Sequence, residues 1–111
     1  MHLLEILSGE CSNMSGLEIL IHVKPQKRQE FLCALEAFTS EECRLEGCVS
    51  VGVFEEHGIP NHFLWMERWQ RQAILEERLR SGSFHALLGA IKVLGELQSL
   101  NIVEFEDRRV L

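Results

Sequence analysis

The spacing of apolar residues changes several times along this chain of 111 residues, and the order of the changes constrains its fold. Apolar residues alternate with other residues over 17–23, which predicts a strand. From 26 to about 43 they recur at helical spacing. Alternation returns over 48–55 and over 63–69, and the Gly- and Pro-containing segment 57–61 between them predicts a hairpin turn.

The second half of the chain continues the same pattern. Residues 70–79 and 84–94 show helical spacing, Gly95 is suited to cap the latter helix, and 100–105 predicts a last strand. The resulting order is β-α-β-β-α-β with an extra helical segment before the final strand. This order predicts an α+β, ferredoxin-like fold in which an antiparallel sheet has its helices on one face.

The domain is expected to cover residues 17–106. Ser-Gly and Ser-Asn pairs indicate that 1–16 is a loose extension, and 107–111 is a polar tail. The chain start has no basic segment and carries Glu5 within its apolar residues, which makes it a poor secretory signal. No apolar run approaches the ~20 residues of a membrane span. We therefore expect a cytoplasmic protein without a membrane partner.

The charge balance argues against nucleic acid as a partner. Asp and Glu number 17 against 11 Lys and Arg, a net charge of −6. Nucleic-acid binders usually carry a basic surface, whereas the densest basic stretch here, 68–80, is interleaved with glutamates. That stretch is more typical of a solvated helix face with local ion pairs.

The four cysteines show no Cys-x-x-Cys spacing, so free thiols are expected. Cys33 and Cys48 are interpreted as small buried apolar residues. Cys43, Cys48, His57 and His62 would be a candidate zinc set, but the strand that carries Cys48 is expected to aim these side chains apart. We therefore expect no metal site.

Apolar residues occupy both faces of the first three predicted strands. Leu20, for example, lies on the face opposite Ile19 and Ile21. Helices would cover only one face of such a sheet. A homodimer that stacks two sheets face to face would cover the other, so we expect a homodimer through the open sheet face.

Four segments resemble one family in the same order along the chain. They are Leu17–Pro25 for its first strand and turn, Glu46–Ser50 for the entry to its second strand, Asn61–Trp69 for its third strand, and Arg80–Phe84 for a following corner. The chain thus resembles the antibiotic biosynthesis monooxygenase family. The resemblance implies a dimeric α/β barrel with a pocket between sheet and helices. It also implies oxidation of a quinol-like or other small aromatic substrate by dioxygen, without a metal or flavin cofactor.

Three departures from the family pattern leave another function open. Many members carry a His nine residues after the third-strand Trp, where this chain has Arg78, and many carry a second-strand Tyr, whereas this chain has no Tyr. Heme-degrading relatives carry an axial His four residues after the corner Phe, where Leu88 stands here, which argues against a third reading as a heme-binding degrader. The alternative is a non-catalytic dimeric α/β-barrel protein that binds an apolar ligand or serves in a stress response.

Five residues are candidates for contact with an aromatic substrate, and four of them have a plainer alternative. Trp69 and Trp65 would wall the pocket or belong to the core. Asn61 would bond a substrate oxygen or serve only the turn. Phe84 would contact substrate at the corner, and Phe31 is a core residue first and a pocket wall second.

The catalytic candidates are His22, Arg78 and His85. Histidine is the residue type best suited to accept a proton near neutral pH, which makes His22 and His85 candidate bases, although His22 is also suited to solvent or a dimer interface. Arg78 could hold a phenolate but stays charged, so it is a poor proton acceptor. Positions three and four residues before Arg78 hold no acid, which favours an exposed side chain with at most a weak ion pair. His62 and His57 flank the hairpin as weaker candidates.

Overall fold

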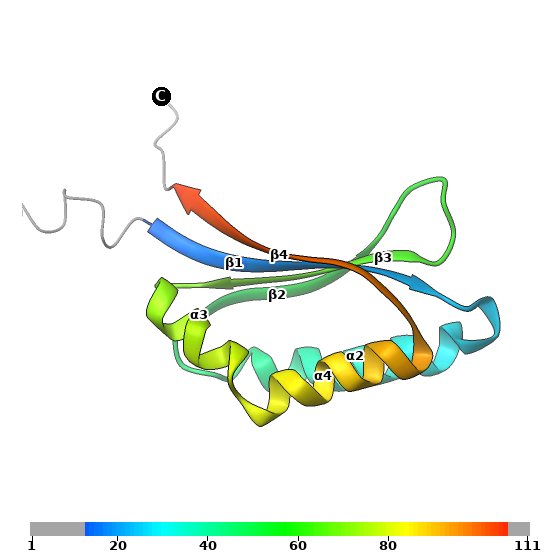
Figure 1. Cartoon of the computed structure of the whole chain (residues 1–111), viewed down its shortest axis with the longest axis horizontal. Coiled ribbons are helices and arrows are strands. Elements are labelled where there is room, and N and C mark those ends of the chain that lie inside the picture. Colours follow the sequence, from blue (N-terminus) through cyan, green and yellow to red (C-terminus); the bar gives the residue numbers. More distant parts are fainter. Residues whose placement is uncertain (1–12, 107–111) are drawn as a thin grey trace, which may run out of the picture.

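Four antiparallel strands and three α-helices follow one another in the order that the apolar spacing predicts. A computed structural model describes residues 13–106. The elements are β1 (Asn13–Val23), a 3₁₀ turn η1 (Pro25–Lys27), α2 (Arg28–Glu42), β2 (Cys48–Glu55), β3 (His62–Trp69), α3 (Gln72–Leu79), α4 (Gly82–Leu94) and β4 (Gly95–Glu106). The strands lie in the order β2-β3-β1-β4 (Figure 1), so the predicted ferredoxin-like α+β fold is confirmed.

The core fills the space between the sheet and the helices, all of which lie on one side of the sheet (Figure 1). Strict alternation along β3 sends every second side chain from Phe63 to Trp69 into this layer. The same alternation buries Leu17, Ile19, Ile21 and Val23 of β1. Helices α2, α3 and α4 contribute the remaining buried apolar side chains: Phe31, Leu35, Leu75, Phe84, Leu87, Ile91 and Leu94.

Strands β1 and β4 are both longer than expected. β1 begins at Asn13, because residues 13–16 pair with 103–106 of β4. Residues 13–16, predicted to belong to the N-terminal extension, are therefore part of β1. Residues 1–12 and 107–111 lie outside the described part of the chain. β4 begins at Gly95 instead of 100. A Cβ atom on Gly95 would come within 2.5 Å of the His22 carbonyl oxygen, so glycine permits the close pairing of the strands there.

A β-bulge corrects the predicted faces of β2. The register with β3 shifts between Cys48 and Ser50, and the additional residue reverses the alternation at this end. Cys48 therefore packs against the core together with Val51 and Val53, whereas Val49 is 48% exposed. Simple alternation predicts that Cys48 shares a face with Ser50, Gly52 and Phe54, and for Cys48 this prediction is wrong. The expectation that Cys48 is shielded from solvent holds in part.

Two helix positions also differ from expectation. Cys33 is exposed, because it lies two residues, or about 200° around the helix, from the buried Phe31. The helical spacing over 70–79 predicts Ala73, Ile74 and Leu79 as inward residues, but the buried residues of α3 are Leu75 and Arg78, and Ala73 is exposed. Ile74 and Leu79 pack partly against the core as expected.

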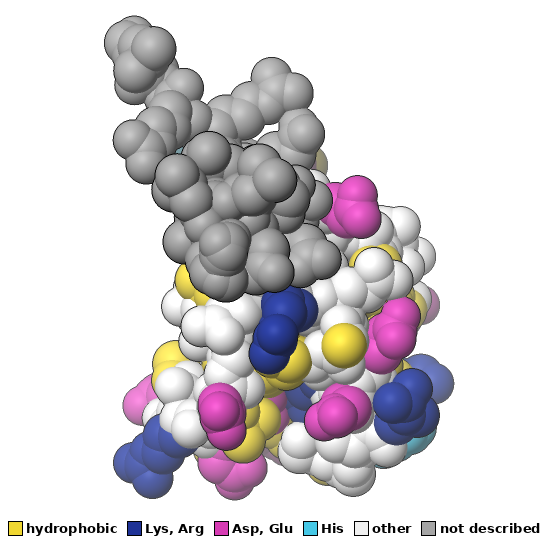
Figure 2. All heavy atoms as spheres, turned by 90° about the vertical axis from the view of Figure 1, so that its left-hand side faces the viewer, with side chains coloured by type: hydrophobic (Ala, Val, Ile, Leu, Met, Phe, Trp, Pro, Cys, Tyr) yellow, Lys and Arg dark blue, Asp and Glu magenta, His cyan; other side chains and the backbone are white. Residues whose placement is uncertain are grey.

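Charges of both signs are interspersed on the face that Figure 2 shows, without a continuous basic track. Within residues 13–106, no helix is long and apolar enough to cross a membrane. The same part of the chain contains no cluster of three or more His, Cys, Asp or Glu side chains arranged to hold a metal ion.

Candidate functional site

A carboxylate, Glu67, lies at the centre of the layer between sheet and helices. Its side chain is completely buried. Alternation on β3 places it between Trp65 and Trp69, and each indole Nε1–H donates to one of its oxygens at 2.8 Å. The two tryptophans predicted as substrate contacts thus share one hydrogen-bond acceptor.

Arg78 of α3 is the cation that balances Glu67. Its Nε and Nη2 donate to the two Glu67 oxygens at 3.2 and 3.0 Å, a bidentate contact. The side chain is 4% exposed. The expectation of an exposed arginine with a weak ion pair is therefore wrong, because the partner acids come from other elements instead of from its own helix.

Glu42, the last residue of α2, is the third member of this buried cluster. Its Oε2 lies 3.1 Å from Arg78 Nε, but neither Glu42 oxygen has a regular hydrogen bond within the described residues. Burial raises the pKa of Glu42, Arg78 opposes this effect, and Glu67 adds to it. Sequence reasoning missed Glu42; the one available signal was an acid at a helix C-terminus, where the helix dipole disfavours negative charge.

A cavity of about 290 Å³ lies beside this cluster. Its wall combines the aromatic ring of Trp69, the guanidinium of Arg78 and two serine hydroxyls. The lining residues are Leu45, Glu46, Trp69, Ile74, Glu77, Arg78, Ser81 and Ser83. Arg78 Nη1 donates to Ser83 Oγ at 2.8 Å, and the guanidinium lies 5.1 Å from the centre of the Phe84 ring. The carboxylates of Glu46 and Glu77 also line this cavity, so its wall combines aromatic, cationic, hydroxyl and acidic groups.

The structure brings four of the eight predicted site residues together around Glu67: Trp65, Trp69, Arg78 and Phe84. Phe31 lies instead near the start of β3, with its ring 4.9 Å from that of Phe63. Asn61 precedes β3 in the left-handed conformation, at φ 69°. Its Oδ1 accepts a hydrogen bond from Arg28 at 2.9 Å, and its backbone N–H donates to Glu55. Asn61 and Phe31 are therefore at the opposite end of β3 from Trp69.

The histidines lie outside the buried cluster. His85 is exposed, and its Nδ1 is 2.8 Å from the carbonyl oxygen of Ser81, a cavity residue. Because a carbonyl only accepts, Nδ1 carries the proton and Nε2 is the basic atom. His22 lies on the open face of the sheet, where its ring centre is 4.6 Å from that of His62. The sheet therefore separates His22 from Arg78.

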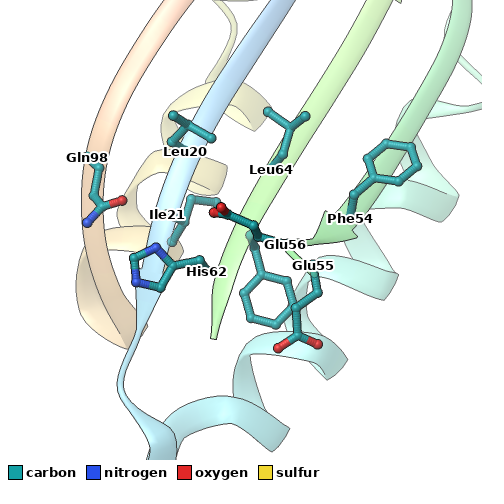
Figure 3. A pocket seen from close by; sticks show the side chains of 9 residues that line it. Leu20, Ile21, Phe54, Glu55, Glu56, His62, Leu64 and Gln98 are labelled. Atoms are coloured by element: carbon teal, nitrogen blue, oxygen red, sulfur yellow. The ribbon is translucent and has the colours of Figure 1, made fainter. Parts of the chain in front are cut away.

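The open face has a second cavity, of about 310 Å³ (Figure 3). Leu20, Leu64 and Phe54 lie in register on β1, β3 and β2 and form an apolar row across it. Leu20 is 44% and Phe54 54% exposed. His62 and Gln98 supply polar groups beside this row. The apolar second face expected from the sequence is thus present and open.

One family profile and two curated proteins are similar in sequence to this chain. The profile of the antibiotic biosynthesis monooxygenase family matches residues 14–89. YcnE of Bacillus subtilis, named as a candidate monooxygenase, is 30% identical over 81 residues, which cover 73% of this chain and 85% of YcnE. An uncharacterised Synechocystis protein is 32% identical over 65 residues, or 59% of this chain, but the match spans only 44% of that protein.

A solved structure supports the fold. SnoaB of Streptomyces nogalater, described as a cofactor-independent oxygenase, superposes with a TM-score of 0.68. The match covers 90% of this chain and 97% of SnoaB, at 16% sequence identity.

Proposed function

This chain belongs to the antibiotic biosynthesis monooxygenase family, and we propose that it oxidises a small aromatic substrate, such as a quinol, with dioxygen. The family match over residues 14–89 is the observation that carries the proposal. The cavity at Trp69 and Arg78 supports it with a wall suited to a phenol-like molecule. We further propose that no metal or flavin takes part, which would agree with the description of SnoaB as a cofactor-independent oxygenase.

The chemistry requires only a few groups from the protein. Loss of the phenolic proton makes the substrate an electron-rich anion that can itself reduce dioxygen, and a dry site prevents side reactions. Arg78, which stays charged, would stabilise the phenolate oxygen, and the Trp69 ring would pack against the aromatic plane. His85, which contacts Ser81 at the cavity wall, would exchange protons with solvent.

We propose that the active form is a homodimer joined through the open sheet face. The exposed row of Leu20, Leu64 and Phe54 would be covered in such a dimer. His22, on the same face, then belongs to the interface and not to the cavity at Arg78.

The test is oxygen uptake by metal-free protein with a panel of quinols and anthrones. We expect a rate well above the uncatalysed one, reduced by Trp69→Phe. Trp65→Phe is the matched comparison, since it removes the same kind of bond to Glu67 but from a residue that does not line the cavity. If both variants lose activity and stability equally, the effect of Trp69→Phe is structural and the cavity is not the site.

One observation favours the non-catalytic alternative. The guanidinium of Arg78 is already occupied by Glu67 and Ser83, as in a purely structural ion pair. A protein that only binds an aromatic ligand would show a rise in Tm with that ligand and no oxygen uptake.

A further inference from the structure

Two histidines, His22 and His62, lie side by side on the open face of the sheet, away from the cavity at Arg78. They are directly opposite each other on β1 and β3. Their neighbours Val23 and Asn61 form a hydrogen-bonded pair, because the Val23 N–H donates to the Asn61 carbonyl oxygen at 2.9 Å. His22 and His62 are therefore a non-hydrogen-bonded pair, the position at which opposite side chains of an antiparallel sheet approach most closely.

The separation of the two imidazole rings fits a shared metal ion. Their centres are 4.6 Å apart. An ion in the plane of an imidazole, about 2.0–2.1 Å from the bound nitrogen, lies about 3.2 Å from the centre of the ring. Two imidazoles on one ion then have centres about 4.5–5.2 Å apart, for N–metal–N angles between about 90° and about 109°. The observed separation falls within this range before any side chain moves.

A carboxylate flanks the histidine pair on either side. Glu96 lies opposite His22 on β4, and its Oε1 is 3.9 Å from His22 Nδ1. Glu56, which follows β2, donates its backbone N–H to the His62 carbonyl oxygen at 2.8 Å, and it lines the same cavity as His62 (Figure 3). The side chains of His22 and Glu96 are 42% and 74% exposed, so an ion can enter from solvent. Two acids beside two imidazoles favour a cation at this end of the open face.

We propose that His22 and His62 bind one divalent transition-metal ion, such as Zn²⁺, through one nitrogen of each ring. Imidazole is a common ligand of Zn²⁺, Ni²⁺ and Cu²⁺. Within residues 13–106, no third His, Cys, Asp or Glu is already in place to complete a cluster of three. Water completes the coordination, or the carboxylate of Glu96 or Glu56 after its side chain rotates.

The ion would join β1 to β3 on the face opposite the cavity at Arg78. It therefore takes no part in the proposed oxidation, and the two proposals can be tested separately. The folded sheet holds the two rings together, whereas the unfolded chain does not. Metal binding should therefore stabilise the folded state.

The experiment titrates the untagged, metal-free protein with ZnCl₂ and follows binding by calorimetry and by Tm. We expect one ion for each chain and a Tm that rises with the Zn²⁺ concentration. His22→Asn and His62→Asn should each weaken binding at least about tenfold, because even the loss of an outer-shell partner of a metal ligand costs about 10- to 100-fold in affinity. His57→Asn and His85→Asn are the matched controls and should bind Zn²⁺ as the wild type does.

Two further measurements distinguish the histidine pair from other zinc ligands. The thiols of Cys33 and Cys43 are exposed, so the double variant Cys33→Ser, Cys43→Ser should keep the wild-type affinity. Co²⁺, a paramagnetic ion, should shift and broaden the NMR signals of the His22 and His62 rings and leave those of His85 unchanged. The same spectra show that each variant is folded.

The outcomes decide the proposal independently of turnover. A wild-type protein that binds no Zn²⁺ overturns it, and so does loss of binding in the double cysteine variant. Wild-type affinity in His22→Asn or in His62→Asn overturns it as well. If the protein binds Zn²⁺ at this pair but consumes no oxygen with any quinol, the monooxygenase proposal fails and the metal site remains.

Discussion

The guanidinium of Arg78, on α3, donates hydrogen bonds to both carboxylate oxygens of Glu67, on β3. The two residues are eleven positions apart in the sequence. The pair is buried, and the remaining capacity of the carboxylate is taken by two indole N–H groups. Without Arg78, the enclosed carboxyl groups of Glu67 and Glu42 would have no compensating cation among their contacts within the described residues. The contact therefore fixes α3 against β3 as well as forming part of the cavity wall.

Arg78→Met should destabilise the protein strongly. Removal of one partner of a buried ion pair typically costs about 3–5 kcal/mol, because it leaves an uncompensated buried charge. Urea denaturation at neutral pH measures the free energy of unfolding. Arg80→Met is the control: Arg80 is exposed two residues away, and its loss should change stability by less than about 0.5 kcal/mol. Similar losses for both variants would contradict a central role for the Arg78–Glu67 pair.

Glu42 should make the protein less stable as pH rises. Its pKa in the folded state is raised above the ordinary value of 4.5, so the folded state binds the proton more tightly than the unfolded chain does. The resulting stabilisation is complete below 4.5 and is lost as pH rises through the folded-state pKa. Glu42→Gln should remove this decline and equal or exceed the wild type in stability at neutral pH. Denaturation of both proteins across this window checks the prediction; a steeper decline in the variant would refute it.

Glu55 should stabilise the protein at neutral pH and lose this stabilising effect as the pH falls. Hydrogen bonds from Arg28 and from the backbone N–H of Asn61 lower the pKa of Glu55 from 4.5 to about 2. Its contribution is therefore present above 4.5 and is lost as pH falls toward about 2. Glu55→Gln should reduce the loss of stability in this range, measured by Tm against pH. Glu56→Gln, at the neighbouring exposed position, should leave the acid limb unchanged.

The open sheet face should control the oligomeric state. We expect light scattering to give about twice the 12.8 kDa chain mass for the wild type. Leu20→Glu should shift the protein to a monomer, because it places a charge within the apolar row. Val93→Glu is the matched control, since Val93 is 71% exposed on α4, on the helical side. A wild-type monomer, or a Leu20→Glu dimer, would show that this face is not the interface.

The alternating strands could be predicted because each pattern is local. Phe63, Trp65, Glu67 and Trp69 share one face in the sequence pattern and in the structure, since a strand turns its side chains with a period of two. The bulge at Cys48 could not be predicted, because it depends on the register with β3. The longer β1 and β4 likewise depend on their pairing with each other.

Only part of the candidate site could be predicted from the sequence, because the rest depends on contacts between distant elements. Trp65, Trp69 and Phe84 could be selected as aromatic side chains in suitable positions. The environment of Arg78 could not, because its partners come from α2 and β3, beyond the three- or four-residue spacing that helix patterns reveal. Glu42 carries no motif, and only the packing of α2 against its neighbours encloses it.

The enclosed cluster contains two carboxyl groups, Glu42 and Glu67, and one guanidinium, Arg78. With both carboxyls ionised, this region has a surplus negative charge; with one proton added, its charges sum to zero. Uptake of a proton therefore neutralises the interior instead of charging it. A dry protein interior favours this neutral state over one with a net charge, so a single shared proton completes the charge balance of the enclosed layer.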